Sequence, residues 1–257
     1  MATADPPPVR AVLLDFYGTL GESDWVEHWF HQVVAERGYE LDRDADRRWA
    51  IEAWDGREHG EHSADEAAYN RWERERWREV LVASDVAEAD LVALLADVDE
   101  RRRRFRMRVY DEVPGVLAEL RARGLRLGIC SNWDWDLDRH LEDAGIAHLV
   151  DARVSSAWVG CRKPHPRIYR AALEALGATA AETVFVGDNW ASDVQGPLAH
   201  GMRAVHVWRH ERAPSWVMEP PPAGDVPRID DLTGLLDLLP APRRGAQGGG
   251  GRTRSSP

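Results

Sequence analysis

The stretch Arg10-Ala-Val-Leu-Leu-Asp-Phe-Tyr-Gly-Thr-Leu20 decides how the rest of the chain is interpreted. Its apolar run, residues 12–14, predicts a strand that is buried on both faces of a parallel sheet. The run ends at Asp15, and Gly18 allows a tight turn just after it. Open α/β sheets bind their ligands at the carboxyl ends of their strands, which makes Asp15 a candidate functional residue. The alternative is an aspartate that only caps a helix.

The composition excludes several classes of protein. The chain has 257 residues, is 44% hydrophobic and carries a net charge of -11, although residues 241–257 hold four Arg and no acidic residue. This acidic balance disfavours nucleic acid as a partner. No apolar run is long enough to cross a membrane, and the first eight residues lack the features of a signal peptide. Two cysteines are too few for a disulfide framework, so we expect a cytoplasmic protein without a membrane partner.

The pattern of apolar residues divides the chain into a core and an insertion. Between about residues 22 and 108 the apolar positions recur at helical spacing without strand-like alternation, which predicts about four helices. We therefore expect a core at residues 1–20 and 110–240 and a helical insertion at 21–109. The Gly- and Arg-rich segment 241–257 is expected to be a disordered tail.

Strands and helices alternate through the second part of the core. The expected strands cover residues 125–130, 149–154, 183–186 and 203–208, and helices are expected between them, one of them near 194–200. A strand remnant and a helix are expected within residues 225–239. This alternation is typical of a doubly wound parallel sheet, in the α/β class.

Polar residues stand where the predicted strands end. Right-handed crossovers place these ends along one edge of the sheet, so Asp15, Ser131 and Asp188 should converge there. Lys163, at the start of a predicted helix, is the only lysine among 33 basic residues. A compact ammonium at a place where a planar guanidinium does not fit explains this choice, although a single lysine retained by chance is the alternative.

These residue types suit transfer of a group through a covalent aspartyl intermediate. Asp15 and Asp188 could share a Mg²⁺ ion, which prefers oxygen ligands. The Ser131 hydroxyl and the backbone amides of residues 16–19 could hold the oxygens of a phosphoryl group. Lys163 would offset the repulsion between an anionic nucleophile and an anionic substrate.

Four motifs in order resemble those of the haloacid dehalogenase (HAD) superfamily, over residues 9–239. They are Asp15-Phe-Tyr-Gly-Thr-Leu20, Cys130-Ser131-Asn132, Lys163-Pro164 and Gly187-Asp188-Asn-Trp-Ala-Ser-Asp193. The helical insertion at 21–109 is similar to the family's α-helical, C1-type cap. The resemblance implies a doubly wound, Rossmann-like parallel sheet with an all-helical cap inserted after the first strand.

The resemblance also implies roles for individual residues. Asp15 would be the nucleophile, and Asp15, the backbone carbonyl of Tyr17 and Asp188 would hold Mg²⁺, with Asp193 supporting the metal ligands. Ser131 and Lys163 would bind the phosphoryl group. The further candidates for contact with the substrate are Gly18, Thr19, Asn132, Trp25 and His28.

Tyr17 departs from the phosphatase pattern. HAD phosphatases usually carry a second Asp two residues after the nucleophile, where it acts as general acid and then base. Asp-x-Tyr-Gly-Thr is typical of the metal-independent 2-haloacid dehalogenases, which usually lack the acid at the position of Asp188. Because this chain keeps Asp188 and Asp193, we favour a Mg²⁺-dependent phosphatase of a small-molecule phosphate monoester, with the leaving group protonated by water, Tyr17 or a cap residue. The alternatives are a dehalogenase and a non-catalytic binding or regulatory protein.

Two further features have competing explanations. The chain has 12 Trp, several of them near the motifs, which predicts an aromatic-walled pocket; packing of the cap on the core is the alternative. The run of Arg residues at 101–104 resembles a phosphate grip, but acidic residues precede it. A solvated helix face is the interpretation we prefer.

Overall fold

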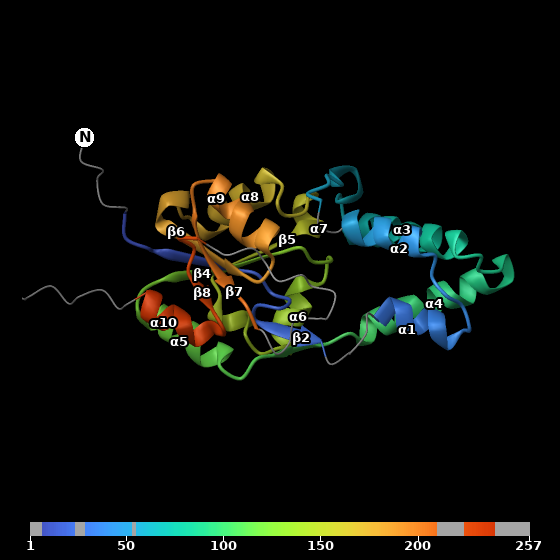
Figure 1. Ribbon diagram of the computed structural model, residues 1–257, viewed down its shortest axis with the longest axis horizontal. Helices are drawn as coiled ribbons and strands as arrows, with labels where there is room; N and C mark the ends of the chain where they lie inside the picture. Colours follow the sequence, from blue (N-terminus) through green and yellow to red (C-terminus); the bar gives the residue numbers. More distant parts are fainter. Residues whose placement is uncertain (1–6, 24–28, 53–54, 210–223, 240–257) are drawn as a thin grey trace, which may run out of the picture.

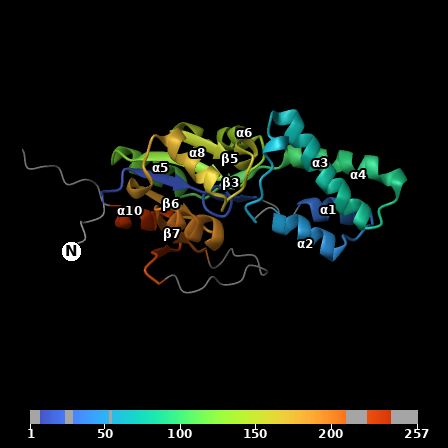
Figure 2. The same cartoon turned by 90° about the horizontal axis from the view of Figure 1, so that it is seen from above.

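The computed structural model describes residues 7–23, 29–52, 55–209 and 224–239. A core built on a sheet carries a helical cap that projects from one end (Figures 1 and 2). The predicted tail at 241–257 and the candidates Trp25 and His28 lie outside the described residues. Within the described residues, no helix combines the length and apolar character needed to cross a bilayer.

The core sheet has six parallel strands in the order β5-β4-β1-β6-β7-β8. This confirms the predicted doubly wound α/β class. The strands are β1 (Ala11–Leu14), β4 (Arg126–Ser131), β5 (Ala152–Ser155), β6 (Thr183–Gly187), β7 (Arg203–Val207) and β8 (Arg228–Ile229). The register pairs Leu14 of β1 with Ile129 of β4 and Val186 of β6, so these three strands end at one edge of the sheet.

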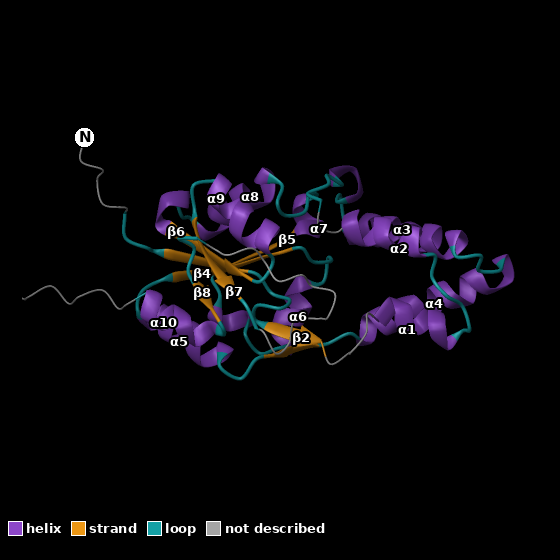
Figure 3. Cartoon of the chain, viewed as in Figure 1, coloured by secondary structure: helices purple, strands orange, loops and turns teal. Residues whose placement is uncertain are grey.

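Helices cover both faces of the sheet (Figure 3). One face packs α5 (Val113–Ala122), α6 (Leu137–Asp143) and α10 (Leu235–Leu238) against an apolar cluster that contains Val12 and Leu14. The other face packs α8 (Pro166–Leu176) against a second cluster that contains Ala11 and Leu13. Side chains alternate along a strand, so the unbroken apolar run of β1 serves both faces at once.

In its described residues, 29–52 and 55–104, the cap has four α-helices and a core of its own. The helices are α1 (Trp29–Glu36), α2 (Arg43–Glu52), α3 (Glu66–Ala83) and α4 (Glu88–Arg104), with a short 3₁₀ helix, η1 (Gly60–His62), between α2 and α3. Their apolar stripes meet in a separate cluster around Phe30, Trp77 and Leu94. The Asp65 carboxylate caps α3 by accepting a hydrogen bond from the Ala68 amide at 2.8 Å. The predicted helical insertion after the first strand is confirmed.

The prediction that residues 22–108 are helical throughout was wrong at both ends. Strands β2 (Gly21–Ser23) and β3 (Met107–Val109) pair antiparallel at the base of the cap. Three residues are too few to show alternation, and the pairing partner lies at the far end of the insertion. A Cβ atom at Gly21 would lie 2.6 Å from the Arg108 carbonyl oxygen, which explains glycine at this position.

Two other predicted elements are shifted. Strand β5 begins at Ala152, because residues 147–149 form a 3₁₀ turn, η2 (Ala147–Leu149). The helix expected near 194–200 is a π-helix, η4 (Trp190–Gln195), followed by a short α9 (Gly196–Ala199). The short helix α7 (Ser156–Val159) follows β5 directly and ends at Gly160.

Candidate active site

Asp15 lies directly after β1 and is almost fully buried. Its Oδ1 accepts two hydrogen bonds, from the Ser131 hydroxyl at 2.8 Å and from Lys163 Nζ at 2.7 Å. Ser131 ends the neighbouring strand β4. Two donors on one oxygen fix the orientation of the carboxylate, as a nucleophile held for attack requires.

Lys163 is 1% exposed and bridges two acids. Its Nζ donates to Asp15 Oδ1 at 2.7 Å and to Asp193 Oδ1 at 2.6 Å. Burial alone would lower the pKa of Lys163, but the charges of the two carboxylates raise it above its ordinary value, so the side chain is an ammonium. The structure therefore places the one lysine of the chain between two carboxylates, where a compact cation fits.

The side chain of Asn132 holds the backbone of Lys163 through two hydrogen bonds. Its Oδ1 accepts a hydrogen bond from the Lys163 amide at 2.6 Å, and its Nδ2 donates to the Lys163 carbonyl at 3.1 Å. The sequence suggested Asn132 as a contact for the substrate. In this structure both ends of its amide are used to fix the Lys163 loop.

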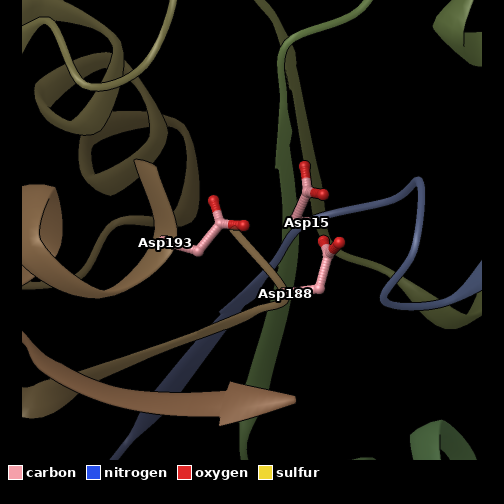
Figure 4. A group of neighbouring side chains, drawn as sticks. All are labelled: Asp15, Asp188 and Asp193. Atoms are coloured by element: carbon pink, nitrogen blue, oxygen red, sulfur yellow. The ribbon is translucent and has the colours of Figure 1, made fainter. Parts of the chain in front are cut away.

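Three carboxylates, those of Asp15, Asp188 and Asp193, gather at the ends of β1 and β6 (Figure 4). Oxygen atoms from all three lie within 4.8 Å of one another. Asp188 accepts a hydrogen bond from the Thr19 hydroxyl at 3.3 Å, and Asp193 Oδ2 accepts one from the Asn189 amide at 3.0 Å. The strand pattern predicted that Asp15 and Asp188 converge at this edge, whereas Asp193 was implied by the resemblance to the HAD family.

The charges in this cluster do not balance. Burial raises the pKa of Asp188 and of Asp193, and the neighbouring Asp15 raises both further, whereas Lys163 lowers them. Within the described part of the chain one ammonium faces these three carboxylates, so a further cation would stabilise their ionised forms. Carboxylate oxygens are ligands that Mg²⁺ prefers. The residues present therefore fit a divalent cation.

Two glycines make room for these carboxylates. A Cβ atom at Gly187 would lie 2.3 Å from Asp193 Oδ2. At Gly18, where φ is +79°, a Cβ atom would contact the Asp188 carboxylate. At both positions the Cβ atom would lie closer to the carboxylate than van der Waals contact allows. The predicted substrate contact Gly18 is thus explained first by the space that Asp188 needs.

The turn after Asp15 fixes the next three residues. The Gly18 amide donates to the Gly21 carbonyl at 2.8 Å, and the Leu20 amide donates to Phe16 at 2.9 Å. The Gly18 amide is therefore engaged within the turn. Thr19 is buried, whereas the Tyr17 side chain is 45% exposed. Tyr17 is therefore open to solvent, unlike Asp15 and Thr19 on either side of it.

Sequence reasoning missed the polar contacts between cap and core. Asp134, two residues after Asn132, accepts hydrogen bonds from Tyr69 of α3 and Arg102 of α4, both at 3.0 Å. Arg162, next to Lys163, donates to Glu73 of α3 at 2.8 Å. Asp134 and Arg162 lie next to the second and third motifs, and this position in the sequence was the one signal that could have pointed to them. Arg102 was expected on a solvated face, but it bonds Asn70 of the cap as well as Asp134 of the core.

The tryptophans near the motifs pack within the protein. The Trp133 ring lies 5.0 Å from Phe16 and 5.1 Å from His140 between ring centroids. Trp158 Nε1 donates to the Trp135 carbonyl at 2.9 Å. These contacts of Trp133 and Trp158 lie within the core and do not join the cap to it.

The comparisons with known proteins agree with this geometry. Residues 9–201 match the family model of the haloacid dehalogenase-like hydrolases. The chain belongs to this family. This HAD hydrolase is 38% identical over 245 residues to a phosphoserine phosphatase of Thermus thermophilus, covering 89% of this chain and 91% of the relative. It is 32% identical over 175 residues to the haloacid dehalogenase-like hydrolase domain-containing protein 3 of Mus musculus, covering 65% and 70%.

The solved structures that resemble this HAD hydrolase include both branches of chemistry. A HAD phosphatase from Thermococcus onnurineus superposes with a TM-score of 0.56 at 21% identity, covering 91% of this chain and 100% of that one. The L-2-haloacid dehalogenase RSc1362 superposes with a TM-score of 0.60 at 24% identity, covering 91% and 99%. These likenesses establish the fold, and the choice between the reactions depends on the site.

Proposed function

We propose that this HAD hydrolase is a Mg²⁺-dependent phosphatase of small phosphate monoesters that works through an aspartyl-phosphate on Asp15. The observation that carries the proposal is the cluster of three carboxylates opposed by a single ammonium. A metal-independent dehalogenase would bring an anionic haloacid against three carboxylates with only the Lys163 ammonium to offset their charge.

Asp15 would be the nucleophile, which its two hydrogen bonds through Oδ1 support. One carboxylate oxygen would bond to phosphorus as the bond from phosphorus to the alcohol oxygen breaks, and the departing oxygen takes up a proton. Water would then attack the phosphorus atom, which releases inorganic phosphate and restores Asp15. Ser131 and Lys163, both bonded to Asp15 Oδ1, would orient the carboxylate, and the ammonium would offset the negative charge of the incoming group.

Asp15, Asp188 and the backbone carbonyl of Tyr17 are the groups that would hold Mg²⁺. The ion would neutralise charge on the transferring phosphoryl group. Asp193 is fully buried and bonded to Lys163 and to the Asn189 amide, which suits a residue that supports the ligands from behind.

Tyr17 bears on which substrates react fastest. The position two residues after Asp15 carries an exposed phenol in place of a carboxylic acid. Without a carboxylic acid there, we expect esters of acidic alcohols, such as aryl phosphates, to react faster than alkyl phosphates. Among alkyl esters we choose O-phosphoserine first, because of the phosphoserine phosphatase relative.

The test is to incubate the purified protein with O-phosphoserine or an aryl phosphate, with Mg²⁺ or with EDTA, and to measure phosphate release. A parallel incubation with a 2-haloacid is assayed for halide. We expect phosphate release that requires Mg²⁺ and is abolished in Asp15→Asn. Halide release in EDTA would favour the dehalogenase alternative. Phosphate binding without turnover of any of these compounds would favour the non-catalytic alternative.

A further inference from the structure

A segment of the cap is paired with the loop that carries Lys163. Residues 57–59, here called the tether, lie in the connection between α2 and η1. The His59 amide donates to the Gly160 carbonyl at 2.8 Å, and the Arg162 amide donates to the Arg57 carbonyl at 3.3 Å. Glu58 and Cys161 form an antiparallel bridge between these two hydrogen bonds. The cap is thus joined to the core by backbone pairing at this loop, in addition to its chain connections.

Side chains on both flanks strengthen the pairing. The guanidinium of Arg162 donates to Glu73 of α3, whose carboxylate is 3% exposed and also binds Arg76 at 2.9 Å. On the other flank His165 Nε2 lies 2.8 Å from Glu58 Oε1. A buried carboxylate shared by two guanidinium groups resists separation, because opening would leave charges unpaired in a low-dielectric region.

The two backbones approach each other closely. Gly160 has a φ of +74°, and a Cβ atom there would lie 2.5 Å from the Gly60 Cα atom. Within the cap, the His59 ring stacks on Trp72 at 4.8 Å, and its Nδ1 lies 3.1 Å from the Ser63 hydroxyl. The tether is therefore fixed to the cap by His59 and to the core through the space left by Gly160.

The tether adjoins the phosphoryl end of the site. Lys163 directly follows Arg162, and its Nζ reaches Asp15 and Asp193. Asn132 holds the Lys163 backbone from the core side, whereas the tether holds residues 160–162 from the cap side. A displacement of this loop by 1 Å would misplace the ammonium, and such errors are costly in catalysis.

A second contact between cap and core, at Asp134, is built differently. Tyr69 and Arg102 reach Asp134 through side chains only, and Asp134 is about one-third exposed, although the buried Tyr69 hydroxyl also lies 3.2 Å from Glu73 Oε1. Side-chain contacts of this kind break at lower cost than a buried strand pairing with a charged network. We infer that the tether is a positioning element for Lys163 that stays docked during turnover, while the Asp134 contacts are the ones that release. The effect on rate rests on the proposed phosphatase function.

A disulfide tests whether the tether stays docked. The hydrogen bonds flank Glu58 and Cys161, which makes them a non-hydrogen-bonded pair with Cα atoms about 4.5 Å apart, within the range of about 4.4–6.8 Å that a disulfide spans. Glu58→Cys can therefore be oxidised with the native Cys161. Glu58→Ser controls for loss of the Glu58 carboxylate. The double variant Glu58→Cys/Cys161→Ser controls for oxidation that does not form this disulfide.

We expect Mg²⁺-dependent phosphate release by Glu58→Cys to differ by less than about twofold in kcat between the oxidised and the reduced protein. An oxidised protein that is inactive and is restored by a reductant would show that the tether must release, which would overturn the inference.

A second variant separates positioning from folding. Gly160→Ala should force the tether away from the loop and lower kcat at least about tenfold with KM changed less than about twofold, because the ammonium acts on the transferring group. Gly145→Ala is the control, since Gly145 has a φ of +70° and nothing within 4 Å of a Cβ atom. Equal loss of stability in both variants with no difference in kcat would overturn the inference.

Amide hydrogen exchange tests docking without any assay of activity. The His59 and Arg162 amides should exchange slowly in the unaltered protein and rapidly in Gly160→Ala. Rapid exchange in the unaltered protein would overturn the inference. Slow exchange in a protein that hydrolyses no phosphate ester would refute the proposed function and leave the docking of the tether standing.

Discussion

The edge of the sheet and the cap hold their polar residues in different ways. At the edge, Asp15, Ser131 and Asp188 follow strands whose register is fixed, and their hydrogen bonds join side chains of the same buried cluster. In the cap, polar groups reach the core through long side chains such as Arg102, or through the tether. The comparison teaches that strand register fixes the positions of the polar groups at the sheet edge. The cap, by contrast, reaches the core through individual side chains and the tether.

The strongest way to break this comparison is Asp15→Asn. We expect it to lower kcat by at least about 10³-fold, because an amide cannot replace the nucleophile. The matched change in the cap is Arg101→Gln on α4, which removes an exposed ion pair with Glu36 and should alter kcat by less than twofold. Steady-state phosphate release measures kcat for both variants. Comparable losses of kcat in the two would contradict the contrast between the sheet edge and the cap.

Asp193→Asn should weaken the affinity for Mg²⁺ by about 10–100-fold, the usual effect of removing a residue that supports metal ligands. The amide keeps the shape of the side chain but removes a charge that faces Lys163. Calorimetric titration with Mg²⁺ measures the change. Asp97→Asn on the cap surface removes an exposed ion pair with Arg37 and should leave the affinity as it is.

Two glycines with the same backbone conformation sharpen the contrast. Gly18 in the core has a φ of +79°, and Gly38 in the cap has a φ of +81° with nothing within 4 Å of a Cβ atom. Alanine should cost about 1–2 kcal/mol of unfolding free energy at either position through backbone strain. Only Gly18→Ala should also lower kcat, at least tenfold, because the methyl group displaces the Asp188 carboxylate. Chemical denaturation and phosphate release measure the two effects.

The smallest expected effect concerns His59 in the cap. Burial, together with the charge of Arg162, lowers the pKa of His59 to about 3. In the unfolded chain the imidazole takes up a proton near pH 6.5, so folding becomes less favourable as the pH falls below that value. Between pH 7 and 5.5 we expect a loss of no more than about 1 kcal/mol of unfolding free energy.

His59→Gln should lack this part of the pH dependence, whereas a change at the exposed His148 should retain it. Urea denaturation at several pH values gives the unfolding free energies. A slope that is unchanged in His59→Gln would show that His59 is not held neutral in the folded protein.

Much of the catalytic edge could be predicted because local patterns determine it. The apolar run before Asp15 predicts a strand buried on both faces, and Asp188 follows a similar run, so their convergence needs only the handedness of the crossovers. Lys163 was predicted to be a functional residue because it is the only lysine among 33 basic residues. The fold class was predicted correctly on this basis, and the family from the resemblance of the four motifs.

The contacts of the cap could not be predicted in the same way. Arg162 and Glu73 are 89 residues apart, and nothing periodic in the sequence pairs them. The bridge between Glu58 and Cys161 involves one residue on each side, and β2 and β3 have three residues each, too short for an alternating pattern. Such pairings depend on how the cap sits on the core, which local propensity does not encode.

The most direct test of the central claim is to look for the phosphoryl group on Asp15. The protein is mixed with substrate and Mg²⁺, quenched in acid during turnover and digested, and the peptide that contains residues 10–20 is analysed by mass spectrometry. We predict a phosphoryl group on Asp15 that is absent with EDTA and absent from Asp15→Asn. Release of phosphate with Asp15 unmodified, and the phosphoryl group on another residue, would contradict the account.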